Sequence, residues 1–126
     1  MAEAHTATLW NWARVPKRVW GPVGWNWLHR LAINYPVEPT LQEALSAFNE
    51  IWTFAECLPC AECRREALRY ITAIPPDMQS TYSLQEWARV FHNSVNLRLK
   101  KPQMSQEAYK LAYADEILRA SVFTRS

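Results

Sequence analysis

The 126-residue sequence predicts an all-α protein, in which five short helices form a compact bundle. The chain contains only two glycines, Gly21 and Gly24, and it has neither an Asn-Gly hairpin turn nor an alternating run of β-branched residues. Apolar residues instead recur every three or four positions between prolines and capping residues, which is typical of amphipathic helices. With 49% hydrophobic and 13% aromatic residues, a chain of this length can form one domain around a real core.

Prolines and capping residues indicate where the first two helices should begin and end. Gly21-Pro22 should open a first helix that reaches about Asn34, and Pro36 should help to close it. Thr40-Leu-Gln-Glu43 is a capping box, in which the two end side chains satisfy backbone N–H groups at the start of a helix. The second helix should bury an apolar stripe composed of Leu41, Leu45, Phe48, Trp52 and Ala55.

Three further helices should follow. Pro59 lacks an N–H group and has a fixed φ, so it suits the first position of a third helix that runs to about Ile74. Ser83-Leu-Gln-Glu86 is a second capping box, and the fourth helix behind it should end at Lys100. Ser105 should cap a fifth helix, whose apolar positions are Ala108, Leu111, Ala112 and Leu118.

Composition excludes several classes of partner. The formal net charge is +2 and no basic run is long, so nothing indicates binding to nucleic acid or to an anionic membrane. No apolar stretch approaches the roughly 20 residues that span a bilayer. Met1–Thr8 is polar and lacks the apolar core of a signal peptide. We therefore expect a soluble, unsecreted protein with one domain at 18–120, a partly disordered, Trp-containing tail at 1–17 and a second tail at 121–126.

All three cysteines lie in one segment, Glu56-Cys57-Leu58-Pro59-Cys60-Ala61-Glu62-Cys63. At the start of a helix, Cys60 and Cys63 would share one face with their Cα atoms about 5 Å apart, a separation that a disulfide tolerates. The positive end of the helix dipole favours a thiolate, and a thiol of low pKa exchanges disulfides readily. The pair therefore predicts a redox dithiol. Arg64-Arg65 should be a solvated face, although it could also help to lower the thiolate pKa.

The same residues allow other interpretations. Cys57 falls outside the pair and should be a small core residue at the end of the second helix. The three cysteines together with His92 could bind a metal ion, but the neighbours of His92 fit a flavin site better. Tryptophans can stack on single-stranded bases, yet helical core spacing favours packing for Trp27, Trp52 and Trp87. Three further tryptophans could pack a tail against the bundle or mark a partner surface: Trp10, Trp12 and Trp20.

Rapid oxidation of thiols by oxygen needs an electron acceptor that side chains do not provide, so a cofactor is expected. A chain with two glycines has no Gly-x-Gly-x-x-Gly motif, and a flavin would have to bind between helices. Trp25 and His29 share a face of the first helix, as His92 and Asn96 do on the fourth. These groups suit stacking on an adenine and hydrogen bonding to a ribose or a ring edge. Cations that could bind a pyrophosphate are Arg18, Lys100 and Lys101.

Four motifs, in order and spacing over roughly residues 18–102, resemble the Erv/ALR family of FAD-linked sulfhydryl oxidases. They are Trp20-Gly-Pro-Val-Gly-Trp25-Asn-Trp-Leu-His29, Asn34-Tyr35-Pro36, Phe54-x-x-x-Leu58-Pro59-Cys60-x-x-Cys63, and Trp87 followed by His92-Asn93-x-Val95-Asn96-x-x-Leu99-x-Lys101-Pro102. Any one of them is weak evidence, since Cys-x-x-Cys alone is common, but together they are highly specific.

The resemblance implies a four-helix bundle with a short fifth helix, FAD at the mouth of the bundle and a homodimer. It implies an enzyme that oxidises protein dithiols to disulfides and reduces oxygen to hydrogen peroxide. By position, Cys63 would be the thiol next to the flavin and Cys60 the interchange thiol that meets the substrate. The residues expected to bind FAD are Arg18, Trp20, Gly21, Trp25, His29, Tyr35, His92, Asn93, Val95, Asn96, Leu99, Lys100, Lys101 and Tyr113.

The chain departs from the family pattern at several positions. The glycine that usually precedes the last lysine is Lys100, the aromatic residue before Pro-Cys is Leu58, and the C-terminal tryptophan over the flavin is replaced by Tyr113. The additional structural disulfide and the shuttle cysteines of longer cellular members are missing. The short form is similar to the versions in large DNA viruses, and its cysteine pair would have to meet substrate proteins, or a small redox-carrier protein, directly.

If the protein is viral, the resemblance implies the host cytoplasm, virus assembly sites or the virion as its location; otherwise the mitochondrial intermembrane space is the alternative. Two functions from other classes remain open at this point. One is a flavin-free disulfide exchanger or redox-regulated binding module, although the sequence lacks the βαβ pattern that is usual for thioredoxin-type exchangers. The other is a small interaction domain stabilised by a metal ion.

Overall fold

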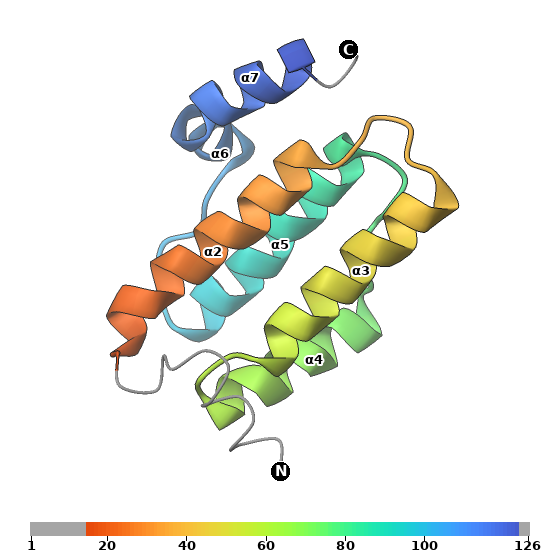
Figure 1. The fold of residues 1–126 in the computed structure, drawn as a ribbon. Helices are drawn as coiled ribbons and strands as arrows, with labels where there is room; N and C mark the ends of the chain where they lie inside the picture. Colours follow the sequence, from red (N-terminus) through yellow and green to blue (C-terminus); the bar gives the residue numbers. More distant parts are fainter. Residues whose placement is uncertain (1–14, 124–126) are drawn as a thin grey trace.

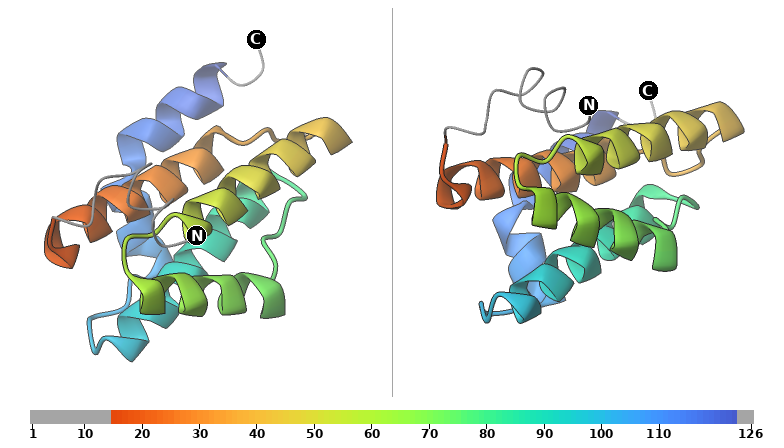
Figure 2. Two further views of the ribbon diagram at one scale, coloured as in Figure 1. Left: turned by 60° about the horizontal axis from the view of Figure 1, so that its bottom comes forward. Right: turned by 90° about the horizontal axis from the view of Figure 1, so that it is seen from below.

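The structure, a computed structural model, describes residues 15–123, and the regular elements in this range are all helices (Figure 1). They are α2 (Lys17–Asn34), α3 (Leu41–Glu56), α4 (Ala61–Ala73), α5 (Thr81–Arg98), α6 (Gln106–Ala112) and α7 (Ala114–Phe123). α2 packs along α5 and α3 packs on α4, and α6 and α7 lie beside α2, on the side away from α3 and α4 (Figures 1 and 2). The prediction of an all-α bundle is confirmed, while Trp10, Trp12 and most of the expected tails lie outside the described residues.

α2 begins at Lys17, four residues before the position that the sequence predicts, and Pro22 lies inside the helix. The ring of Pro22 removes one N–H donor, but Gly21 before it has no Cβ to clash with that ring. The backbone N–H groups of Val19 and Trp20 bond to the carbonyl oxygen of Pro16, which completes the first turn. The sequence predicts that Pro22 opens the helix, but Gly21 before it lets the helix continue through this proline.

One predicted capping box is confirmed and the other is wrong. The N–H of Glu43 donates to Thr40 Oγ1 at 3.1 Å and the N–H of Thr40 donates to Glu43 Oε1 at 2.8 Å, as expected. In α5 the box is formed by Ser80 and Ser83, so the helix begins at Thr81 rather than behind Ser83. The hydroxyl of Thr81 donates to the carbonyl oxygen of Ala32 at 2.7 Å, and this bond ties the start of α5 to the end of α2.

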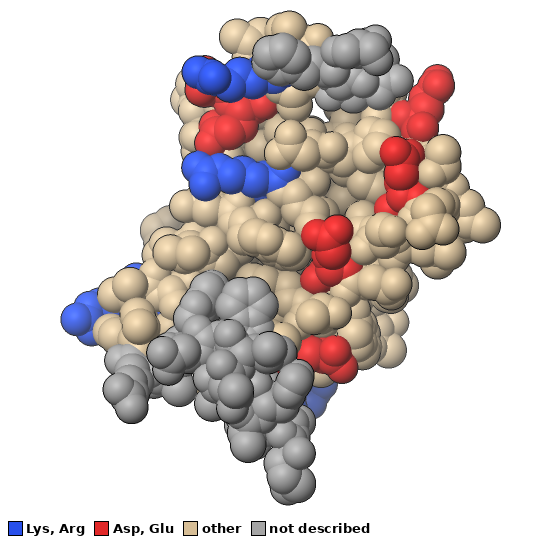
Figure 3. Space-filling view, in the orientation of Figure 1, with Lys and Arg blue, Asp and Glu red and all other residues tan. Residues whose placement is uncertain are grey.

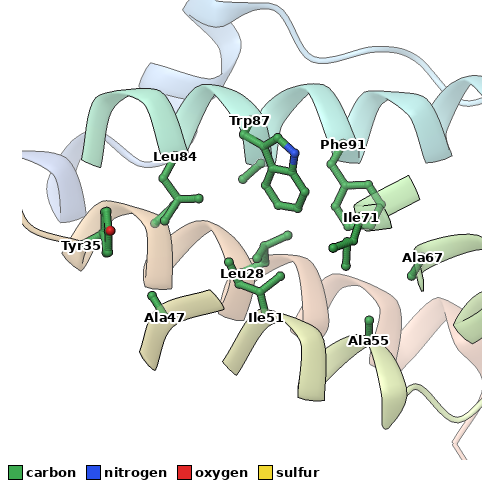
Figure 4. Packing of buried hydrophobic residues seen from close by; sticks show 12 residues of the cluster. Leu28, Tyr35, Ala47, Ile51, Ala55, Ala67, Ile71, Leu84, Trp87 and Phe91 are labelled. Carbon is green, nitrogen blue, oxygen red and sulfur yellow. The ribbon is translucent and has the colours of Figure 1, made fainter. Parts of the chain in front are cut away.

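The apolar stripe predicted for α3 is only partly buried. Leu41 and Leu45 are 76% and 53% exposed, whereas Ala47, Ile51 and Ala55 face the core (Figure 4). The two small alanines beside Ile51 let this face of α3 approach the bundle, so the neighbouring row of leucines stays at the surface. All four long helices contribute large buried side chains to the core cluster: Leu28, Ile51, Ile71, Leu84, Trp87 and Phe91.

The three tryptophans expected to pack in the core differ in their surroundings. Trp87 is buried and its indole N–H donates to the carbonyl oxygen of Ile74 at 2.9 Å. Trp52 is half-buried and packs against the core cluster. Trp27 is 37% exposed and stacks on Phe54 at the surface, with ring centroids 4.7 Å apart, so the prediction of core packing is wrong for this residue.

The C-terminal segment forms two helices where the sequence predicts one: α6 ends at Ala112, Tyr113 is its C-cap residue, and α7 begins at Ala114. Ser105 caps α6, as predicted. Tyr109 and Tyr113 are buried in a small second cluster with Ile33, and the hydroxyl of Tyr113 donates to Asn26 Oδ1 at 2.6 Å. These contacts hold the C-terminal segment against α2. No helix of the described part of the chain is long and apolar enough to cross a membrane.

α5 ends in a Schellman motif that explains why a glycine is usual at position 100. The N–H of Lys100 bonds to the carbonyl oxygen of Leu97, and the N–H of Lys101 bonds to that of Asn96. Lys100 therefore has a φ of 59°, in the left-handed region that L-residues adopt at a cost. The geometry at position 100 therefore favours glycine, and Lys100 does not line the cavity described below.

A Lys100→Gly substitution is expected to stabilise the protein. Glycine removes the left-handed strain but loses more conformational entropy on folding, so the free energy of unfolding should rise by about 0.5–1 kcal/mol. Urea denaturation monitored by circular dichroism measures this change. Gln103→Gly is the control, since the described residues other than Lys100 all have a negative φ. A Lys100→Gly protein no more stable than the Gln103→Gly control would contradict the explanation.

Candidate functional site

The Cys60–Cys63 pair forms the N-terminal cap of α4. Cys60 is the N-cap residue, and its Sγ accepts a hydrogen bond from the backbone N–H of Cys63 at 3.2 Å. The sulfur thus takes the place of a capping hydroxyl or carboxylate oxygen. Pro59 lies outside the helix, so the prediction that it occupies the first helical position is wrong by two residues. Both thiols are partly exposed and free in this structure.

The two thiols differ in acidity. Burial alone would raise the pKa of Cys60, but hydrogen bonds from the side chain and backbone of Cys63, the charge of Lys17 and the backbone of Glu62 lower it below its usual value. Burial, the hydrogen bond to Cys60 and the charge of Cys60 raise the pKa of Cys63 to about 11, against the opposing effect of Lys17. In the reduced pair Cys60 therefore ionises first, as expected of a sulfur at a helix N-terminus.

The prediction that Arg64 and Arg65 form a solvated face is wrong for Arg64, and neither arginine is among the groups that shift the pKa of a thiol of the pair. Arg64 is buried and its guanidinium donates to the carbonyl oxygen of Leu58, which fixes the loop between α3 and α4. Arg65 is exposed on α4. The cation that influences both sulfurs is Lys17, which comes from the first turn of α2 and was not among the predicted site residues.

Cys57 lies at the end of α3 and is buried, in agreement with its expected place in the core. Its thiol is free. Within residues 15–123 no three His, Cys, Asp or Glu side chains come close enough together to hold a metal ion. The structure therefore gives no support to the alternative in which all three cysteines and His92 bind a metal.

A cavity of about 810 Å³ lies between the four long helices. This volume is within the range of roughly 300–1,000 Å³ that is common for small-molecule sites. Cys63 contributes to its wall, whereas Cys60 does not. The pair therefore bridges two environments, because one sulfur faces the cavity and the other lies outside its lining.

Ten of the fourteen residues predicted to bind the cofactor line this cavity. They are Arg18, Trp20, Gly21, Trp25, His92, Val95, Asn96, Leu99, Lys101 and Tyr113. The structure brings together segments far apart in the sequence: Trp25 of α2 stacks on His92 of α5, with ring centroids 4.0 Å apart and an angle of 10° between the rings.

The other four predicted residues do not line the cavity. His29 lies behind His92, and Lys100 is an exposed residue of the Schellman motif. Tyr35 is buried near the end of α2, where its hydroxyl donates to the carbonyl oxygen of Met78. Asn93 forms two hydrogen bonds with the backbone of Met104, at 2.7 and 2.8 Å, and so holds the segment that leads into α6. In this structure Tyr35 and Asn93 support the fold around the site.

His29 and His92 form a buried imidazole pair. His29 Nε2 lies 2.9 Å from His92 Nδ1, so one ring donates a hydrogen bond to the other. Burial and the proximity of His92 lower the pKa of His29 to about 3, and burial and the charge of Lys101 lower the pKa of His92 to about 4. Both rings are therefore neutral at pH 7. His29 Nδ1 is buried without a hydrogen-bond partner, which is an unsatisfied polar group of the kind that a bound ligand or water can complete.

The histidine pair predicts a loss of stability in mild acid. Because both pKa values lie below that of an exposed histidine, the unfolded chain binds more protons than the folded one as the pH falls below about 6.5. The stabilisation is complete above that pH and is lost on acidification, so the free energy of unfolding should fall by roughly 2–4 kcal/mol between pH 7 and pH 5.

Urea denaturation at pH 7, 6 and 5 measures this slope, in a range where most carboxylates stay ionised. A His92→Phe variant retains an aromatic ring against Trp25 but removes one titrating group, and its slope should be smaller. Equal stability of the original protein at pH 7 and pH 5 would show that the buried imidazoles do not control its acid sensitivity.

Several cavity residues were missed by reasoning from the sequence. Tyr70 and Phe91 stack on each other at 4.7 Å and add an aromatic wall, and Asn26 positions Tyr113. Tyr70 follows Cys63 by seven residues on the same helix, a spacing of two turns that could have identified it. Together, the cavity offers aromatic surfaces and neutral imidazole and amide groups, and the charged residues around them are Lys17, Arg18, Glu66, Arg69, Arg98 and Lys101. Such a lining suits a flat aromatic ligand that carries an anionic group.

Comparisons with known proteins agree with this chemistry. The sequence profile of the Erv1/Alr family matches residues 22–114. An African swine fever virus protein (isolate Pig/Kenya/KEN-50/1950), named as an FAD-linked sulfhydryl oxidase, is 39% identical over 79% of this chain and 84% of its own length. The mitochondrial FAD-linked sulfhydryl oxidase ERV1 of Saccharomyces cerevisiae is 30% identical over 75% of this chain and 50% of its own length.

A solved structure shares the fold. The crystal structure of the FAD binding domain of Erv1 from Saccharomyces cerevisiae superposes with a TM-score of 0.72 and 29% identity, over 76% of this chain and 91% of that domain. The residues that the profile matches contain the cysteine pair, the whole of α3, α4 and α5, and α2 from Pro22 onward. Sequence profile, curated relatives and fold lead to one conclusion: the chain belongs to the Erv1/Alr family.

Proposed function

We propose that this protein is an FAD-dependent thiol oxidase, which forms disulfide bonds in protein substrates and passes the electrons through Cys60 and Cys63 to FAD and oxygen. The observation that carries the proposal is the position of the pair, with Cys63 on the cavity wall and Cys60 outside its lining. The relatives named as FAD-linked sulfhydryl oxidases support the same reaction. Dithiol substrates and oxygen are the reactants that this activity requires.

The residues present fit FAD. The aromatic rings of Trp25, Tyr70 and Phe91 would stack on flat ring systems, and Asn96 and His92 would supply hydrogen bonds. Cations that would meet a pyrophosphate are Arg18 and Lys101. Bound there, FAD supplies a two-electron acceptor that oxygen can re-oxidise, with hydrogen peroxide as the product.

The protein side chains carry the thiol chemistry. A substrate thiolate attacks Cys60 Sγ, which forms a substrate–Cys60 bond, breaks the Cys60–Cys63 bond and leaves the electron pair on Cys63 Sγ. A second substrate thiolate then attacks the substrate sulfur of this mixed disulfide, and Cys60 leaves as a thiolate. The lowered pKa of Cys60 makes it a good leaving group. Cys63, on the cavity wall, is placed to pass on the two electrons as the Cys60–Cys63 disulfide forms again.

A homodimer is the second part of the proposal. Val19, Val23 and Trp27 form an exposed apolar row on α2, and Leu41 and Leu45 form another on α3. Buried helix faces usually carry such rows, so a second copy that covers them would remove apolar area from water. α3 carries acidic residues but no Lys or Arg, as Figure 3 shows for this face. Analytical ultracentrifugation of the original chain and of a Val23→Glu variant tests the dimer, which the charge should dissociate.

The physiological partner would be a protein dithiol or a small redox-carrier protein that reaches Cys60 directly. As a site of action we put forward the host cytoplasm where virus particles assemble, because the viral relatives are more similar to this chain than the yeast mitochondrial one. Fluorescence microscopy of the tagged protein during infection tests this location.

The oxidase proposal is tested with the purified protein. We expect a yellow protein with flavin absorbance that consumes oxygen in the presence of a reduced dithiol peptide and releases one hydrogen peroxide for each disulfide formed. A colourless protein that only exchanges disulfides, and that binds no added FAD, would contradict the proposal and support a flavin-free exchanger instead.

A further inference from the structure

We propose that Lys17 is a functional residue of the thiol chemistry, whose ammonium group is the counter-ion of whichever sulfur of the Cys60–Cys63 pair carries the negative charge. The inference rests on the proposed thiol–disulfide function and assigns it a residue outside the family motifs quoted above. It concerns the thiols of this chain, and its test does not require oxidase activity.

The placement of Lys17 is the first support. Lys17 is the first residue of α2, and its side chain lines the same cavity as Cys63. Its Cγ lies 4.0 Å from the position that a Cβ on Gly21 would occupy, so its stem runs along the next turn of α2, at a glycine that also lines the cavity. The cation and the sulfur therefore come from the starts of two different helices, α2 and α4, that meet at this cavity.

The start of α2 is otherwise an unfavourable place for a lysine. The positive end of a helix dipole favours acidic residues in the first turn, yet this turn carries Lys17 and Arg18 and no acid. The N-cap, Pro16, also makes no side-chain hydrogen bond. Local helix stability does not explain Lys17. A residue that breaks a local rule in this way is often retained for a site rather than for the fold.

The electrostatics of the pair give independent support. The charge of Lys17 lowers the pKa of Cys60 and opposes the rise in the pKa of Cys63. Arg64, the nearest arginine in sequence, is instead bonded to the carbonyl oxygen of Leu58. Glu62 acts on Cys60 through its backbone, not through its carboxylate charge.

This placement is useful at both steps of the exchange. When the substrate attacks Cys60, the electron pair of the broken disulfide bond goes to Cys63, and a nearby cation stabilises that leaving thiolate. When the second substrate thiolate resolves the mixed disulfide, the charge appears on Cys60, whose thiolate the charge of Lys17 also favours. One lysine can serve both steps because the two sulfurs lie one helical turn apart.

The test is the pH dependence of Cys60 alkylation in the reduced full-length protein, read by mass spectrometry of the Cys60 peptide under anaerobic conditions. A Lys17→Met substitution keeps the apolar stem and removes the charge. We expect it to raise the apparent pKa of Cys60 by about one unit and to slow alkylation at pH 7 about threefold, since a tenfold loss of thiolate is partly offset by greater nucleophilicity. Lys17→Arg should restore the original profile.

The matched control is Arg65→Met, which removes the same charge from an exposed position of α4 two residues after Cys63. It should leave the alkylation profile unchanged. Lys17→Met should not lower the melting temperature, because a lysine at a helix N-terminus does not stabilise the helix. An unchanged profile in Lys17→Met, or an equal shift in Arg65→Met, would overturn the proposal. Flavin content, measured on the same samples, reports separately on the oxidase proposal, so the two can fail independently.

Discussion

Replacing Cys63 by serine is expected to abolish dithiol-dependent oxygen uptake, with a loss of about a thousandfold or more, because the hydroxyl can neither form the disulfide nor pass electrons into the cavity. Cys60→Ser should lose activity toward a reduced dithiol peptide to the same extent, since the substrate then has no sulfur to attack. The two effects should not add in the double variant, because the two residues act as one unit. An oxygen electrode with peroxide detection measures all three proteins.

Cys57→Ser is the control that the chain itself provides. Cys57 lies three residues before Cys60 but is buried at the end of α3, so its substitution should retain most of the oxygen uptake and affect mainly stability. Activity that survives in Cys63→Ser, or that disappears in Cys57→Ser while the protein remains folded, would assign the redox pair to the wrong sulfurs.

A Trp25→Ala substitution is expected to have the second largest effect. Trp25 lines the cavity, stacks on His92 and contacts the edge of Phe91. Since stacking of an aromatic side chain on a base is worth about 1–3 kcal/mol, FAD affinity should fall by roughly tenfold to a hundredfold. Fluorescence titration of the flavin-free protein with FAD measures this affinity. Trp25→Leu keeps more apolar volume and serves as a second variant if the alanine protein is unstable.

Trp27→Ala is the matched control for Trp25, because both residues lie on α2 but face different surroundings. Trp27 stacks on Phe54 at the outer surface and does not line the main cavity. Its substitution should leave FAD affinity within about twofold of the original value, since Trp27 itself does not line the cavity, and it should act instead on the proposed dimer. Equal losses in Trp25→Ala and Trp27→Ala would indicate a general effect on the helix rather than loss of a cofactor contact.

Much of the helical fold follows from local sequence, and the exceptions have identifiable causes. The capping box at Thr40 and the cap at Ser105 depend only on neighbouring residues, and both are confirmed. The start of α5 was misplaced because Ser83-x-x-Glu86 matches the usual box, whereas Glu86 in fact pairs with Arg89 at 2.6 Å. Thr81 is held at the helix start by a carbonyl oxygen of α2, and such a long-range contact leaves no local signal.

The site is predictable only in part, because local patterns identify residues on each helix but not the contacts between helices. Single-helix patterns place Trp25 beside His29 and His92 beside Asn96, and only the resemblance to a family joins the two helices around one ligand. The structure brings Trp25 and His92 into contact. Lys17 could not be connected with the cysteines in this way, because its role depends on the meeting of two helix starts that lie more than forty residues apart in the chain. Tyr35 has an aromatic ring that suits a binding site, but its burial on folding places it in the core.

The most direct measurement of the central claim, that Cys63 is the sulfur next to the flavin, is the visible spectrum of two single-cysteine variants loaded with FAD. In Cys60→Ser the lone Cys63 thiolate should lie against the oxidised flavin, and a broad long-wavelength charge-transfer band should grow as the pH rises. In Cys63→Ser, with Cys60 outside the cavity lining, this band should be absent. A band in Cys63→Ser and none in Cys60→Ser would reverse the assignment, and the absence of flavin from both folded proteins would contradict the account as a whole.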